Sequence, residues 1–127
     1  MAGLILDSNA LLALINSKDI HHESIVNRIL RSEERLSISV ITYSEALVHP
    51  FEVNRSEMVI AQINSRISDV FDVTIPIASR AAQLRSILKM KLPDALIAAT
   101  AIEKGLTLLT FDEKLARRTP GAELLVS

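Results

Sequence analysis

The 127-residue sequence contains no cysteine and no tryptophan, and only four of its side chains are aromatic: Tyr43, Phe51, Phe71 and Phe111. The lack of cysteine excludes disulfide bonds, a thiol nucleophile and a thiolate metal site, and it is compatible with a reducing compartment. With so few aromatic side chains, a platform on which nucleic-acid bases could stack is not evident. The chemistry of this protein must therefore come from other side chains.

The sequence also lacks an excess of charge of either sign, since 14 Lys and Arg residues are matched by 15 Asp and Glu residues. No overall basic field draws the protein to nucleic acid, so any contact with a polyanion must be local. No apolar run approaches the roughly 18 residues of a membrane helix. The opening residues, MAGLILDSNA, lack the basic segment of a signal peptide. We expect a cytoplasmic protein without membrane segments.

What the sequence does contain is 49% hydrophobic residues, enough for one packed domain over residues 1–127. Short apolar runs predict strands at 3–6, 36–40, 70–75, 106–110 and 122–126. Helical patterns occupy 8–17, 20–34, 42–49, 55–69, 77–90 and 93–104, and a short helix follows Asp112. Pro50 is expected to end the third of these helices. Such alternation is typical of an α/β fold whose parallel sheet is covered by helices on both faces.

Four acidic residues stand at related places in this pattern. Asp7 and Asp112 directly follow predicted strands, and Glu45 lies in the first turns of the helix after another strand. Because ligands of such sheets bind outside the carboxyl ends of the strands, these three acids should meet at one edge. Asp94 begins the very apolar helix 93–104, and it joins them only if that helix starts at the same edge. The predicted topology permits this arrangement without demanding it.

Each acid also has a purely structural explanation. Asp7 and Asp112 could be N-caps of the helices that follow them. Thr42 and Glu45 have the spacing of a capping box, and an acid such as Asp94 is favoured in a first helical turn by the helix dipole. These acids adjoin the most apolar segments of the chain, however, whereas caps are common on the surface. The set is therefore better explained by a shared site.

Carboxylates gathered at one edge repel one another, and a divalent cation removes the conflict. Mg²⁺ or Mn²⁺ suits a site made of oxygen ligands and would keep several waters. His21, His22 and His49 fall elsewhere in the sequence, so a zinc site is not expected. The polar surroundings of the three histidines predict that they lie at the surface.

Four stretches in this order, LILDSNALLAL, ITYSEAL, LPDALIAATA and LLTFDEKLA, resemble the signature blocks of PIN-domain ribonucleases. They look most like those of the small VapC toxins of prokaryotic toxin–antitoxin pairs, and the resemblance covers residues 4–118. It implies a PIN-like three-layer sandwich around a parallel five-stranded sheet. The sequence departs from the family pattern at Pro93, before the third acid, and at Leu115, where an aromatic residue is common.

The same resemblance implies an acidic quartet made of Asp7, Glu45, Asp94 and Asp112. Asn9 would help to position Asp7, and Thr110 would form hydrogen bonds within the site. The family also implies an RNA substrate, a cognate antitoxin as partner and a homodimer. The expected reaction is the metal-assisted hydrolysis of RNA phosphodiester bonds, with phosphate contacts from Lys89, Lys91, Lys114, Arg117 and Arg118.

Two alternatives remain open from the sequence. The first is a PIN-fold binding module with little or no nuclease activity. The second is another α/β phosphoryl-transfer enzyme. A phosphatase, however, would need a second aspartate where Asn9 stands, and a receiver domain would need an acidic pair early in the chain and a lysine after a late strand.

Overall fold

The computed structural model describes residues 3–126, and its centre is one parallel sheet. The strands lie in the order β3-β2-β1-β4-β5, and all four neighbouring pairs are parallel. The sheet that the sequence predicted is thereby confirmed. Its strands are β1 (Leu4–Leu6), β2 (Leu36–Ser39), β3 (Asp69–Phe71), β4 (Thr107–Thr110) and β5 (Glu123–Leu124).

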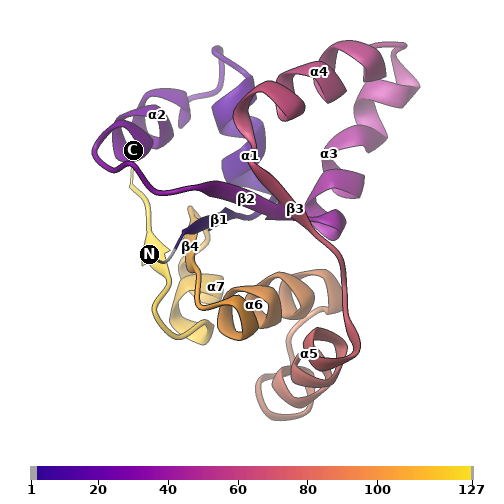
Figure 1. Ribbon diagram of the computed structural model, residues 1–127, viewed down its shortest axis with the longest axis vertical. Helices are drawn as coiled ribbons and strands as arrows, with labels where there is room; N and C mark the ends of the chain where they lie inside the picture. The colour runs from indigo at the N-terminus through magenta and orange to yellow at the C-terminus, as the bar shows by residue number, and fades with distance from the viewer. Residues whose placement is uncertain (1–2, 127) are drawn as a thin grey trace.

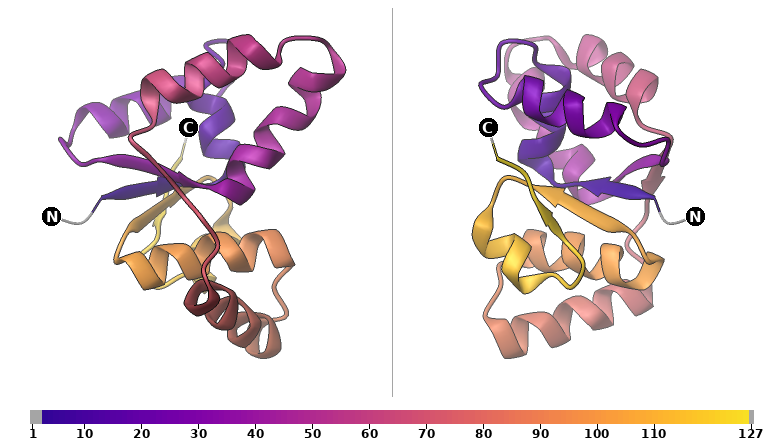
Figure 2. Two further views of the ribbon diagram at one scale, coloured as in Figure 1. Left: turned by 45° about the vertical axis from the view of Figure 1, so that its right-hand side comes forward. Right: turned by 90° about the vertical axis from the view of Figure 1, so that its left-hand side faces the viewer.

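Helices cover both faces of the sheet and make the fold a three-layer sandwich (Figures 1 and 2). One face carries α1 (Ser8–Ile15), α2 (His22–Leu30), α3 (Val40–Glu52) and α4 (Ser56–Arg66), and the other carries α5 (Ile75–Leu88), α6 (Leu92–Lys104) and α7 (Glu113–Arg118). No helix within residues 3–126 has the length and apolar character needed to span a bilayer.

Two hydrophobic cores lie on the two sides of the sheet because successive strand residues point to opposite faces. Leu4 and Leu6 belong to the core beneath α1–α4, whereas Ile5 packs against α5 and α6. All three side chains are at most 1% exposed. Burial of each contributes about 1.5–3 kcal/mol to folding. This explains why the strands are apolar runs without the alternation of a half-exposed sheet.

The expectation that Pro50 ends a helix is wrong, since α3 continues through Pro50 to Glu52. Pro50 is buried in the same helix face as Ala46 and Leu47, and its carbonyl accepts a hydrogen bond from the Arg55 amide at 2.8 Å. A proline within a helix removes one hydrogen bond, and packing of this buried face offsets that loss.

Most other differences between predicted and observed elements are at their ends. The strand expected at 70–75 ends at Phe71, because Thr74 caps α5 with its hydroxyl and the helix begins at Ile75. The strand expected at 122–126 is limited to Glu123–Leu124. The helices expected at 20–34 and 55–69 span 22–30 and 56–66. Element ends are the least certain part of a sequence-based assignment.

The strand register determines which residues meet at the carboxyl edge of the sheet. Leu6 of β1 is paired with Ile38 of β2 and with Leu109 of β4. The next residue, Asp7, is therefore level with Ser39 and Thr110. On the other face, α6 ends at Gly105, whose φ of 65° is left-handed, and the chain enters β4 two residues later. Because α6 leads directly into β4, it runs back along the sheet and its first turn lies at the carboxyl edge.

Candidate functional site

Asp7 is the most deeply buried of the four acids, with 6% of its surface exposed. It is the N-cap of α1, and its Oδ1 accepts a hydrogen bond from the Ala10 amide at 2.9 Å. Its Oδ2 accepts a hydrogen bond of 2.5 Å from the Thr110 hydroxyl. Burial raises the pKa of Asp7, the two hydrogen bonds oppose that rise, and the charges of Asp94 and Asp112 add to it.

Thr110 joins Asp7 to Asp112. Its buried hydroxyl donates to Asp7 and accepts a hydrogen bond from the Asp112 amide at 3.0 Å. Asp112 in turn caps α7, since its Oδ1 accepts from the amides of Lys114 at 2.9 Å and Leu115 at 3.1 Å. The structural roles of Asp7 and Asp112 as N-caps are therefore real, and both caps lie at the same edge of the sheet.

Glu45 reaches this edge from α3 and is exposed. Its Oε1 accepts a hydrogen bond from the hydroxyl of Ser8, the residue next to Asp7. The expected capping box of Thr42 and Glu45 does not form, because α3 begins at Val40 and its N-cap is Ser39. Thr42 therefore lies inside the helix, where its buried hydroxyl has no hydrogen-bond partner among the described residues.

Asp94 lies in the first turn of α6 and is partly buried. Burial is the main cause that raises its pKa, and the charges of Asp112 and Glu45 raise it further. Lys91 and Arg118 act in the opposite direction. The charges of two other acids thus raise the pKa of Asp94, and the charges of Asp94 and Asp112 raise that of Asp7. The structure brings the four acids, which come from four separate segments, into one electrostatic cluster at the carboxyl edge.

The cluster consists of oxygen donors, the chemistry that Mg²⁺ and Mn²⁺ prefer. Within residues 3–126, no three acidic or histidine side chains are close enough to hold a metal ion directly. Both oxygens of Asp7 and one oxygen of Asp112 accept hydrogen bonds from the protein. The donor set fits a hydrated divalent cation, because Mg²⁺ keeps several of its waters and needs few direct carboxylate ligands.

The histidines are less exposed than the sequence predicts. His21 and His22 are both partly buried, and Nδ1 of His22 lies 2.7 Å from the carbonyl oxygen of Ala13. The ring of His21 stacks on Phe111 with 4.3 Å between the centroids, and it therefore lies beside the residue that precedes Asp112. His49 is exposed as expected and pairs with Glu52 at 3.5 Å.

The role of Asn9 in positioning Asp7 stays a prediction. The Asn9 side chain is exposed, and no hydrogen bond joins it to Asp7 in the described part of the chain. Ser8, which the sequence analysis did not single out, makes the contact across to Glu45. Serine is common at the start of a helix, so its residue type did not mark Ser8 as part of a site. Only its position next to Asp7 could have indicated this contact.

The five basic candidates differ in their relation to the four acids. Lys91 and Arg118 are close enough to Asp94 for their positive charges to lower its pKa. Lys114 is exposed and follows Asp112 by two residues, and Arg117 pairs with Glu113 at 3.8 Å. Lys89 ends α5 in a left-handed conformation and is also exposed. The structure thus places two of the five cations within electrostatic range of the acids.

This fold is that of a known class. The profile of the PIN domain matches residues 4–120, which is most of the chain. The protein belongs to the PIN-domain family, as the four sequence stretches indicated. No curated protein matches the sequence significantly.

Solved structures give the same result and relate the chain to VapC-type toxins. A toxin–antitoxin complex from Klebsiella pneumoniae matches with a TM-score of 0.81 and 27% identity, over 95% of this chain and 96% of that chain. DNA-bound VapBC from Salmonella typhimurium matches with a TM-score of 0.76 and 26% identity, over 98% and 97%. VapC20 from Mycobacterium tuberculosis, a toxin that cleaves the sarcin–ricin loop, shares the fold with a TM-score of 0.72 and 16% identity, over 94% and 98%.

Proposed function

We propose that this protein is a metal-dependent endoribonuclease and the toxin of a type II toxin–antitoxin pair. The observation that carries the proposal is the convergence of Asp7, Glu45, Asp94 and Asp112 at one edge, where the pKa values of Asp7 and Asp94 are raised. Burial is the largest cause of both shifts, and the charges of neighbouring acids add to it, so that a bound cation would relieve both. Membership of the PIN-domain family and the likeness to toxin–antitoxin complexes support the same conclusion.

Asp7, Asp94 and Asp112 would hold one or more Mg²⁺ or Mn²⁺ ions, directly or through water. A bound divalent cation lowers the pKa of a water molecule and stabilises negative charge on the phosphate. Thr110 supports the ionised form of Asp7 and fixes its orientation. Ser8 holds Glu45, whose exposed carboxylate can orient the attacking water and accept its proton.

The substrate must be held by local cations, because the chain has a net charge of −1 and the acids repel phosphate. The charges of Lys91 and Arg118 lower the pKa of Asp94, and these two side chains would contact phosphates on either side of the cleaved bond. Lys89, Lys114 and Arg117 extend this set. We further propose that the protein acts on RNA in the cytoplasm, binds a cognate antitoxin and forms a homodimer, in line with the complexes that it resembles.

The direct test is cleavage of an end-labelled RNA by purified protein with Mg²⁺ or Mn²⁺, with excess EDTA, and with Asp94→Asn. We expect cleavage only with the cation, and a loss of about 100-fold or more in Asp94→Asn, the usual effect of removing one electrostatic contributor. Glu57→Gln changes an exposed acid of α4 and should leave the rate unchanged. Cleavage that persists in EDTA, or in Asp94→Asn at the wild-type rate, would contradict the proposal.

A second candidate is a PIN-fold binding module with little nuclease activity. The observation in its favour is that no three acidic side chains within residues 3–126 are close enough to hold an ion directly. In that case the same assay would show no cation-dependent cleavage while the protein still bound its partner.

A further inference from the structure

The loop between α1 and α2, residues 16–21, places a histidine at the carboxyl edge of the sheet. The ring of His21 stacks on that of Phe111, with 4.3 Å between the centroids and 23° between the ring planes. Phe111 stands between Thr110, the last residue of β4, and Asp112. His21 therefore lies next to the segment that carries one of the four acids, although it comes from a distant part of the chain.

The two rings of this stack differ in what supports them. Phe111 packs against the hydrophobic core beneath α1–α4, whereas His21 belongs to a connecting loop. Both residues are partly exposed. Of the four aromatic residues in the sequence, Phe111 alone is next to an acid of the cluster. The stack thus supplies an aromatic surface near the acids, which the sequence did not reveal because one of the two rings is a histidine.

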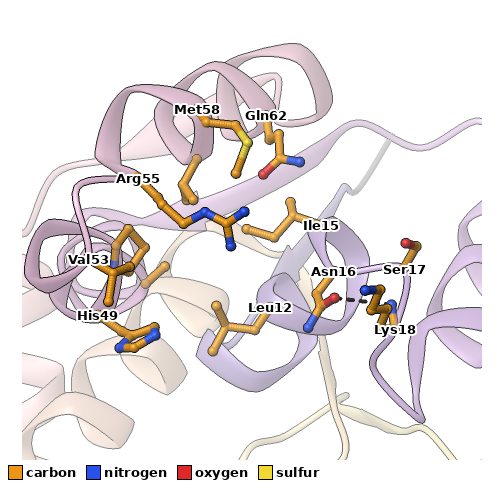
Figure 3. Close-up of a pocket in the computed structure, with 13 residues that line it drawn as sticks. Leu12, Ile15, Asn16, Ser17, Lys18, His49, Val53, Arg55, Met58 and Gln62 are labelled. Atoms are coloured by element: carbon orange, nitrogen blue, oxygen red, sulfur yellow. Dashed lines mark hydrogen bonds between the residues drawn. The ribbon is translucent and has the colours of Figure 1, made fainter.

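Hydrogen bonds fix the backbone of His21 within the folded protein. Its amide donates to Oδ1 of Asp19 at 2.8 Å, and its carbonyl oxygen accepts from the Ile25 amide at 3.1 Å. Earlier in the loop, Oδ1 of Asn16 accepts from the Lys18 amide at 3.1 Å (Figure 3). A group that is already ordered loses less entropy when a ligand binds to it. The ring of His21 is therefore well suited to hold a flat ligand.

A nucleobase is the flat ligand that suits this place. Bases of single-stranded RNA stack on aromatic side chains, histidine included, whereas bases within a duplex are already stacked on one another. Exposed Lys18 precedes His21 in the loop, and exposed Lys114 follows Phe111 in the chain. These lysines can hold the phosphates on the two sides of such a base.

We propose that the stack of His21 on Phe111 binds one base of the RNA next to the cleaved bond, with His21 in direct contact with the base. This inference rests on the proposed cleavage of RNA at the acidic edge. It adds that the substrate is single-stranded at this position and that a purine is preferred there, because a larger ring system stacks more strongly. A stack that merely closed the core would affect the stability of the fold and not the choice of base.

The test measures RNA binding by fluorescence anisotropy in Asp94→Asn, which should bind RNA without cutting it. The probes are labelled strands of about 12 nucleotides: oligoadenylate, oligouridylate and an oligomer of abasic ribose phosphates. His21→Ala and His21→Phe are compared in this background, with His49→Ala as the matched control. His49 is an exposed histidine that lines a separate groove between α1, α3 and α4 (Figure 3). Circular dichroism and thermal unfolding check that each variant is folded.

We expect oligoadenylate to bind more tightly than oligouridylate, and the abasic oligomer to bind most weakly. His21→Ala should weaken the binding of oligoadenylate about tenfold, the usual contribution of one stacked base, and leave that of the abasic oligomer unchanged. His21→Phe and His49→Ala should keep the affinities of the parent protein. The proposal is overturned if no strand binds, if His21→Ala weakens all three strands equally or none of them, or if His21→Phe binds as weakly as His21→Ala.

The failure of this inference is distinguishable from the failure of the nuclease proposal. Cation-dependent cleavage that keeps its rate and its base preference when His21→Ala is made in the wild type would overturn the base contact and leave the nuclease standing. Base-dependent binding through His21, without cation-dependent cleavage of RNA by the wild type, would support the base contact and contradict the nuclease.

Discussion

Replacement of Thr110 by valine tests how the acidic edge is built. Valine has nearly the same shape, so the buried site is left without a cavity, but both hydrogen bonds of the hydroxyl are lost. A hydrogen bond to a charged group contributes about 1.5–3 kcal/mol, and an unpaired, partly buried amide costs about 1 kcal/mol. Thr110→Val should therefore lower the free energy of unfolding by about 3 kcal/mol, which corresponds to roughly 10 °C in Tm for a chain of this size.

The assay is urea unfolding followed by circular dichroism in EDTA, with Thr110→Ser as the matched control. Serine keeps the hydroxyl and loses one buried methyl group, at a cost of about 1 kcal/mol. The hydrogen bond from Thr110 favours the ionised form of Asp7 and so lowers the pKa of that carboxyl. The stabilisation is therefore largest when Asp7 is ionised, and the difference between the two variants should shrink as the pH falls through the pKa of Asp7.

Equal stability of Thr110→Val and Thr110→Ser at pH 7 would refute this account. Equal stability would mean that the short contact between Thr110 and Asp7 contributes nothing to the folded state. A stability difference between the two variants that grows as the pH falls would also contradict the argument, because the hydrogen bond would then favour the protonated form of Asp7.

Three further predictions concern stability. Burial and neighbouring acids raise the pKa of Asp94 above its value in the unfolded chain. The ionised carboxylate therefore destabilises the fold, and stability is lost as the pH rises through the pKa of Asp94 in the folded protein. Asp94→Asn should therefore raise the metal-free Tm by about 2–4 °C at pH 7, a value reduced for solvent exposure, and the gain should vanish near pH 3. Thr42→Val removes a buried hydroxyl without a partner and should stabilise by about 1 kcal/mol in urea unfolding; a destabilised variant would show that the hydroxyl is satisfied. Gly105→Ala forces a side chain into a left-handed conformation and should lower the free energy of unfolding by about 1 kcal/mol; an unchanged urea midpoint would contradict this.

Much of the fold could be predicted because its central strands β1, β2 and β4 are buried on both faces. Short apolar runs such as LIL of β1 are typical of a covered parallel sheet, and the helical patterns between them complete the α/β order. The continuation of α3 through Pro50 could not be predicted, because local propensity argues against it and the outcome depends on burial of that helix face. Tertiary packing of this kind is absent from a local sequence pattern.

The placement of the acids was only partly accessible from sequence. The positions of Asp7 and Asp112 after strands followed from the pattern, and the position of Asp94 required the observed turn from α6 into β4. The contact between Ser8 and Glu45 depends on how α1 and α3 pack against each other on the same face of the sheet. Residues that are 37 positions apart carry no local signal of such a meeting.

The central claim is that the four acids share a hard divalent cation. Isothermal titration of Mn²⁺ into wild type, Asp7→Asn, Asp94→Asn and the control Glu57→Gln measures this directly. The account predicts saturable binding by wild type and Glu57→Gln, and affinities at least about tenfold weaker in the two aspartate variants, since a lost carboxylate removes both a ligand and a charge. Absence of saturable Mn²⁺ binding by the wild type, or equal affinities in all four proteins, would contradict it.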